Sequence, residues 1–292
     1  MMSVINSLGP LVDTSKTPQV KLRSSLSIFL SFICAGLSLL TLIPLLSIVF
    51  LVLRNGVPLL KPSLFTSLPP AVGSAGGGFG NAVIGTLIMV SLALVIAAPV
   101  GILAAIYINE YDRGSGFSCT VRFIAKLLTG IPSIICGIFV FSVLVVHLGF
   151  SAMAGSIALA ILILPTILLT SEQALLGVPY ALREASTGLG ATVFQTIWCI
   201  VLPEALPAMT TGLMLAIARA AGETAPVLFT ALFSSYWPKS IGHPTASLSV
   251  LIYNFSNIPY DYQANLAWAA SLVLVGIVTI TSVTAQLLVR KR

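Results

Sequence analysis

The 292-residue chain has few charged side chains, since Asp, Glu, Lys and Arg make up 8% of it and hydrophobic residues 57%. Soluble proteins carry about 25% charged residues, so a soluble domain of this length could not cover its surface. The two histidines, His147 and His243, stand apart, and no metal-binding or nucleophile cluster is visible in the sequence. The four cysteines form no C-x-x-C pair. A catalytic residue, a metal site and a disulfide framework are therefore not expected.

The sequence contains several long apolar segments. A helix needs about 20 apolar residues to cross the hydrocarbon core of a bilayer. Six segments meet this requirement, at residues 25–53, 81–108, 123–147, 153–171, 205–232 and 264–289. The sequence therefore predicts an all-α membrane protein with six transmembrane helices.

The distribution of lysine and arginine predicts the orientation, because cytoplasmic segments are enriched in these residues. With both termini in the cytoplasm, three basic residues lie outside (Arg54, Lys61 and Lys239) and ten lie inside: Lys16, Lys21, Arg23, Arg113, Arg122, Lys126, Arg183, Arg290, Lys291 and Arg292. We expect a cytoplasmic N-terminal tail at residues 1–24 and a basic cytoplasmic tail at 290–292. The basic residues are scattered, which disfavours a nucleic-acid partner.

Residues 54–80 are predicted to form a Gly-rich outer loop that acts as a flexible linker. Glycine-rich loops can hold phosphates, but this one lacks the G-x-x-x-x-G-K-[ST] pattern. If the protein depends on ATP, another polypeptide must bind the ATP and Mg²⁺ and hydrolyse the nucleotide. No cofactor is expected in this chain.

Proline and small residues mark the predicted spans. Ala93, Ala97, Gly101 and Ala105 recur every four residues, which favours close helix packing in lipid. Proline inside a helix removes a hydrogen bond and bends the chain. We therefore expect helix kinks at four positions: Pro99, Pro132, Pro165 and Pro226.

The inner segment 172–204 predicts a short cytoplasmic helix between Pro179 and Gly190, residues that suit a helix start and a helix stop. Thr192 and Gln195 have the spacing of a capping box for the next helix. Pro203 and Pro207 are then expected to turn the chain into the fifth span.

Two charged residues lie inside that fifth span. Arg219 and Glu223 are four residues apart and are expected on one helical face. Because insertion scales give a cost of about 2.5–3.5 kcal/mol for Arg at the centre of a membrane helix, such residues usually mark a functional site. The pair predicts either an ion pathway or a structural ion pair, within this helix or to a partner.

The inner segment also carries a family motif. Glu184-Ala185-Ser186, Gly190 and Ile200-Val201-Leu202-Pro203 resemble the EAA motif of ABC-transporter permeases, E-A-A-x3-G-x9-I-x-L-P, with Ser186 as the only departure. Two further stretches are similar to phosphate permeases, Ala98–Tyr107 with Glu110-Tyr111 and Gly130–Ser133. Arg219–Ala231 resembles the A-type permeases of phosphate transporters. The resemblance covers roughly residues 80–290.

This resemblance implies a type I ABC-permease fold, with a core permease domain at 81–289, in the bacterial cytoplasmic (inner) membrane. It implies transport of inorganic phosphate with a second, C-type permease, two ATPase subunits and an extracytoplasmic phosphate-binding protein. Arg219 and Glu223 would lie on the transport pathway. The residues that couple the chain to the ATPase would be Glu184, Ala185, Gly190, Ile200, Leu202 and Pro203.

Other functions remain open at this point. A permease of the same architecture could carry sulfate or molybdate, and a non-transporting scaffold or phosphate-sensing subunit is also compatible. A stand-alone secondary transporter would need ion-coupling carboxylates, whereas Glu223 is the only acidic residue predicted deep in a span. It would also leave the motif at 184–203 unexplained.

Overall fold

The structure is a computed structural model that describes residues 18–290. It divides into two units, Met1–Leu51 and Val52–Arg292. Helix α1 (Pro18–Gly56) contains the predicted first span, and its residues up to Leu51 make up the described part of the first unit. Of the two predicted tails, residues 1–17 and 291–292 lie outside the described residues, while residues 18–24 are already helical.

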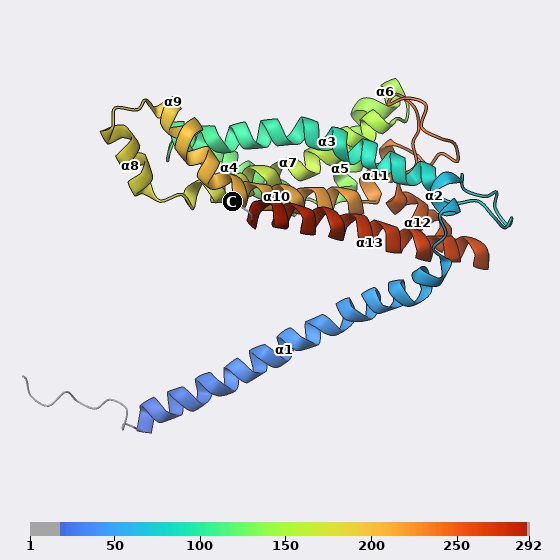
Figure 1. Ribbon diagram of the computed structural model, residues 1–292, viewed down its shortest axis with the longest axis horizontal. Coiled ribbons are helices and arrows are strands. Elements are labelled where there is room, and N and C mark those ends of the chain that lie inside the picture. The colour runs from blue at the N-terminus through green and yellow to red at the C-terminus, as the bar shows by residue number, and fades with distance from the viewer. Residues whose placement is uncertain (1–17, 291–292) are drawn as a thin grey trace, which may run out of the picture. The chain divides into compact units, whose positions relative to one another are not determined.

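Four long helices form the body of the second unit (Figure 1). They are α3 (Gly80–Ile106), α7 (Ala152–Leu176), α10 (Leu202–Gly222) and α13 (Asp261–Arg290). The small residues of α3 face α7, and Ala93, Ala97 and Ala105 are fully buried. A Cβ atom on Gly101 would lie 2.9 Å from the Ile167 side chain. The close packing predicted from the small-residue stripe is confirmed.

Short elements gather at the two ends of this body (Figure 1). At one end, α3 continues into the π-helix η4 (Tyr107–Tyr111), and α8 (Tyr180–Gly188) and α9 (Val193–Thr196) follow α7. At the other end lie α2 (Ser63–Thr66), α6 (Val146–Leu148) and α12 (Leu248–Ser256).

The end of the predicted linker 54–80 is packed at Gly78 and Gly80, which corrects the expectation of a flexible loop there, whereas Gly73 and Gly76 are exposed. After the 3₁₀-helix η3 (Val57–Leu59) and α2, the chain folds back along α2. The Gly78 N–H donates to the Leu68 carbonyl at 2.9 Å, and the Phe79 N–H donates to the Leu64 carbonyl at 2.8 Å. A side chain at Gly78 or Gly80 would collide with the backbone of α2, so glycine is needed here for close approach.

The third predicted span, 123–147, is not one helix. It consists of α4 (Gly116–Gly130) and α5 (Ser133–Val140), which continues through the π-helix η5 (Phe141–Val145) into α6. The two parts are bent by 100°. Ile131 is extended, with φ −72° and ψ 130°, because the ring of the following Pro132 disfavours helical backbone before it. The described residues thus contain five long apolar helices and one bent pair.

The fifth predicted span, 205–232, also differs from one continuous helix. The chain is helical from Val193 to Gly222 through the π-helix η6 (Ile197–Val201), so Pro203 and Pro207 do not turn it as predicted. The Leu202 N–H donates to the Ile197 carbonyl, five residues earlier, which makes a wider, π-helical turn. Pro203 follows directly. Its lack of a backbone N–H falls at the point where π-helical hydrogen bonds give way to α-helical ones. The break comes later, at Glu223 and Thr224, before α11 (Ala225–Thr230).

The predicted proline positions therefore divide into two groups. Pro99 and Pro165 lie inside α3 and α7, each of which continues past its proline as one helix. Kinks at these two positions stay predictions. Pro132 and Pro226 lie beside the two true breaks.

Candidate functional site

The Arg219–Glu223 pair lies at the break between α10 and α11. Arg219 is in the last turn of α10, but Glu223 is extended (φ −71°, ψ 126°) and follows the helix end. The expectation of one shared helical face is therefore wrong in detail. The side chains still meet, with Arg219 Nε 3.4 Å from Glu223 Oε1. The arginine side chain keeps 34% of its exposure and the glutamate 16%.

The guanidinium of Arg219 has unused hydrogen-bonding capacity. Nε is its hydrogen-bonded nitrogen, and within residues 18–290 its two terminal nitrogens donate to no protein atom. Arginine carries five N–H donors in a planar fork. The partly exposed group can therefore receive an oxyanion without first losing its contact with Glu223.

The break itself is supported by α12. Ser249 is a buried residue (5% exposed), and its hydroxyl donates to the backbone carbonyl of Glu223 at 2.8 Å. A carbonyl freed by a helix end inside a membrane must find a donor in the protein or in a water-lined cavity. Ser249 supplies that donor and stabilises the extended conformation of Glu223.

The two broken spans meet beside this site. A Cβ atom on Gly137 of α5 would lie 2.7 Å from Pro226 Cα of α11, so the two half-helices touch through their backbones. Each begins just after a break, α5 after Ile131 and α11 after Glu223. Broken helices that surround a charged side chain are typical of substrate sites in transporters.

The structure divides the predicted ATPase-coupling residues into two places. Glu184 and Ala185 are exposed on α8, and within the described part of the chain Glu184 forms no ion pair. Gly190 follows with φ +83°, a left-handed conformation that favours glycine. The predicted short helix and the Thr192–Gln195 capping box are both confirmed.

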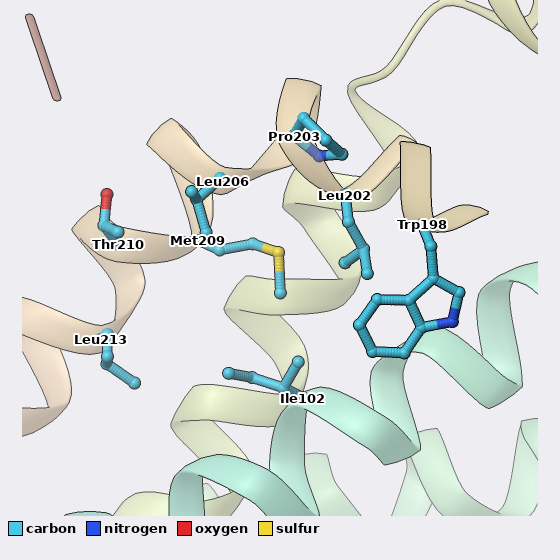
Figure 2. A pocket seen from close by; sticks show the side chains of 8 residues that line it. All are labelled: Ile102, Trp198, Leu202, Pro203, Leu206, Met209, Thr210 and Leu213. Carbon is cyan, nitrogen blue, oxygen red and sulfur yellow. The ribbon is translucent and has the colours of Figure 1, made fainter. Parts of the chain in front are cut away.

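The remaining motif residues belong to the helix after α8. Ile200 lies in η6, and Leu202 and Pro203 begin α10. Leu202 and Pro203 line an apolar cavity of about 370 Å³ (Figure 2), together with Ile102, Trp198, Leu206, Met209, Thr210 and Leu213. Its polar groups are the Thr210 hydroxyl and the Trp198 indole N–H, and it holds no charged side chain, so the cavity is unsuited to an anion.

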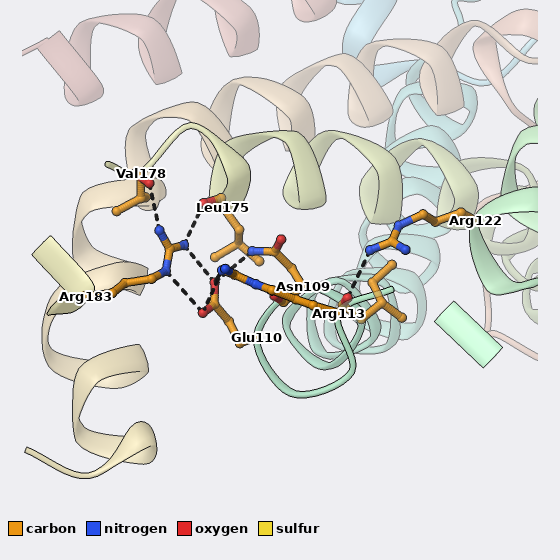
Figure 3. A network of polar contacts seen from close by, with 8 residues as sticks. Asn109, Glu110, Arg113, Arg122, Leu175, Val178 and Arg183 are labelled. Atoms are coloured by element: carbon orange, nitrogen blue, oxygen red, sulfur yellow. Dashed lines mark hydrogen bonds and ion pairs between the residues drawn. The ribbon is translucent and has the colours of Figure 1, made fainter. Parts of the chain in front are cut away.

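A buried polar network at the end that carries α8 was not predicted (Figure 3). Arg183 of α8 pairs with Glu110 of η4, Nη2 to Oε1 at 2.8 Å, and Arg122 of α4 pairs with Glu172 of α7. In the sequence, three arginines of this region served only to predict the orientation of the chain in the membrane: Arg113, Arg122 and Arg183. No spacing rule pairs residues 73 positions apart. The available signal was a carboxylate just after two of the predicted spans, Glu110 after 81–108 and Glu172 after 153–171.

Comparison with known proteins identifies the fold and the family. The family described as "Binding-protein-dependent transport system inner membrane component" matches residues 97–292. The phosphate transport system permease protein PstA of Yersinia pestis is 39% identical over 249 residues, 85% of this chain and 84% of that protein. The probable PstA of Methanocaldococcus jannaschii is 34% identical over 83% of this chain and 86% of that protein.

Solved structures show the same fold. A chain of the inward facing MetNI methionine ABC transporter is 24% identical, with a TM-score of 0.57, covering 72% of this chain and 92% of that one. A chain of a bacterial ABC transporter for alginate is 20% identical, with a TM-score of 0.61, covering 92% and 99%. The all-helical fold is thus that of type I ABC-transporter permeases, and the chain belongs to the binding-protein-dependent transport system inner membrane component family.

Proposed function

We propose that this chain is the A-type permease subunit of an ATP-driven importer of inorganic phosphate in the bacterial cytoplasmic membrane. Relatives named as phosphate transport permeases match most of its length, which supports phosphate as the substrate. The chain works with a C-type permease, two ATPase subunits and an extracytoplasmic phosphate-binding protein. ATP and Mg²⁺ are bound by the ATPase chains, and both termini of the permease lie in the cytoplasm.

The observation that carries the transport role is the partly free guanidinium of Arg219 at a helix break. Arginine stays charged at all physiological pH values, and its fork matches two oxygens of a phosphate. Glu223, 3.4 Å away, reduces the net positive charge of the site. The anion is therefore attracted into the membrane but is not held too tightly to leave.

The coupling role follows from the exposed residues of α8. Glu184 and Ala185 are free to enter a groove on the ATPase. The helical run that follows, Val193–Gly222, contains 30 residues and is about 45 Å long at 1.5 Å per residue. This helical run connects the coupling segment directly to Arg219.

ATP-dependent phosphate uptake by the reconstituted four-component complex tests this function. We expect Arg219→Ala to abolish uptake while the complex still assembles, and Lys126→Ala, at an exposed basic residue of α4, to leave uptake normal. Normal uptake by Arg219→Ala would overturn the pathway role, and loss of assembly would indicate a structural ion pair.

The same assay separates the alternative functions. Competition by sulfate or molybdate at phosphate-like concentrations would identify a permease for another oxyanion. Uptake without the ATPase subunits, driven by an ion gradient, would identify a secondary transporter.

A further inference from the structure

We propose that Arg183 and Glu110 form a clamp that ties the coupling helix α8 to the ends of α3 and α7. The clamp makes these helices move with α8 when the ATPase moves it. This inference rests on the proposed function, because it assumes that an ATPase docks on α8. It assigns Arg183 and Glu110 as positioning residues for coupling.

Arg183 joins three parts of the chain (Figure 3). Its side chain is 10% exposed. Nη2 and Nε bind the two oxygens of Glu110 at 2.8 Å and 3.3 Å, an arrangement with two parallel bonds that fixes direction as well as distance. Nη1 donates to the Val178 carbonyl at 2.7 Å, and Nη2 donates to the Leu175 carbonyl at 2.9 Å.

The two carbonyls explain the connection to α7. Leu175 lies in the last turn of α7 and Val178 just after it, where helix carbonyls lack partners within the helix. A cation also favours the negative end of the helix dipole. Arg183 thus caps α7 from the following helix and keeps the angle between α7 and α8 constant.

Glu110 explains the connection to α3. Its side chain is 7% exposed and lies on η4, the π-helical continuation of α3. It also accepts a hydrogen bond from Asn109 Nδ2 at 2.7 Å and pairs with Arg113 at 3.4 Å. A buried carboxylate that loses its main cation is left with an uncompensated charge, so α3 and α8 cannot separate at low cost.

A second ion pair extends the connection to α4. Arg122 of α4 pairs with Glu172 of α7, whose side chain is 4% exposed, and Arg122 Nη2 donates to the Ile108 carbonyl at 3.0 Å. Movement of α8 therefore reaches α4, and through it α5, by way of the clamp. It reaches α10 and α11 by way of α9. Since α5 and α11 touch at Gly137 and Pro226, the two routes end at one contact.

The test measures ATP hydrolysed per phosphate imported by the reconstituted complex. We expect Glu110→Gln and Arg183→Gln each to raise this ratio roughly tenfold, since each breaks a buried pair. The complex should still assemble and hydrolyse ATP. The double variant should be no worse than Arg183→Gln alone, because without Arg183 the change at Glu110 has no ion pair between them left to break. The control is Arg113→Gln, whose side chain is 44% exposed, and we expect its ratio to stay within about twofold of the wild type.

Two results would overturn the clamp: an unchanged ratio in Glu110→Gln, or additive effects in the double variant. If Arg183→Gln prevents assembly, Glu110→Gln decides, because its amide keeps the size of the side chain but removes the charge and one of the two oxygens that accept hydrogen bonds from Arg183. A wild-type complex that does not import phosphate would refute the proposed function instead.

Discussion

Gly137 of α5 and Pro226 of α11 lie in backbone contact, so that a Cβ atom on Gly137 would lie 2.7 Å from Pro226 Cα. This contact joins the two half-helices that follow the two breaks in the fold. It brings the third and fifth predicted spans together beside Arg219.

Gly137→Ala should therefore weaken both the fold and transport. The methyl group must displace the backbone of α11, and overpacking of this kind costs about 1–3 kcal/mol. We expect a lower thermal unfolding temperature of the purified complex and reduced phosphate uptake. Gly130→Ala is the matched control, because a Cβ atom there meets nothing within 4 Å. Equal behaviour of the two variants would refute the importance of the contact.

Ser249→Ala tests the support of the break at Glu223. The variant removes the hydroxyl that donates to the Glu223 carbonyl at 2.8 Å, at a cost of about 1 kcal/mol. We expect a lower uptake rate from an assembled complex. Without the hydrogen bond from Ser249, the Glu223 backbone is held less firmly, and the Glu223 carboxylate no longer keeps a fixed orientation toward Arg219. Ser256→Ala, on an exposed hydroxyl of the same helix, should change nothing. A wild-type rate in Ser249→Ala would show that the break is stable without α12.

Ser186→Ala tests the residue that departs from the family motif. The Ser186 and Thr196 hydroxyls are buried and lie 2.8 Å apart, which joins α8 to α9. Although alanine is the motif residue, here it leaves the buried Thr196 hydroxyl without this partner, and we expect a loss of about 1–2 kcal/mol in the free energy of unfolding. Adding Thr196→Val should recover part of that loss in thermal unfolding. Increased stability in Ser186→Ala alone would contradict the prediction.

Asp112, in the turn after η4, should make stability depend on pH. Hydrogen bonds from the Ser115 and Ser118 side chains lower the pKa of Asp112 below its ordinary value of 3.8. A lowered pKa in the folded state means that the ionised form stabilises the protein fully above pH 3.8 and that this contribution disappears as pH falls through the lowered value. Thermal unfolding of the wild type and Asp112→Asn should therefore differ at neutral pH and converge in acid. If the difference in unfolding temperature stays constant with pH, ionisation of Asp112 does not contribute to the pH dependence of stability.

The local features of this fold were predictable from short stretches of sequence. Helix α8 runs between the residues that Pro179 and Gly190 indicate, and the Thr192–Gln195 capping box forms as its spacing predicts. The buried stripe at Ala93, Ala97 and Ala105 follows from the same short-range periodicity.

The breaks were less predictable, because hydropathy reports how apolar a segment is and not whether its helix is continuous. Pro165 lies inside an unbroken helix, whereas the chain bends by 100° at Pro132. A proline breaks a helix only where the backbone N–H and C=O groups that it frees find hydrogen-bond partners elsewhere. Those partners come from neighbouring helices. At Glu223 the partner is Ser249, 26 residues away.

The sequence by itself determined the membrane class, the family motif and the presence of Arg219 and Glu223 in an apolar segment, because composition, spacing and periodicity are local properties. The tertiary structure alone decided that this pair lies at a helix break, that α5 touches α11, and that Arg183 binds Glu110 across 73 positions. The physical reason is that burial and ion pairing depend on which helices pack together, and helix packing brings together residues whose separation in the chain carries no signal.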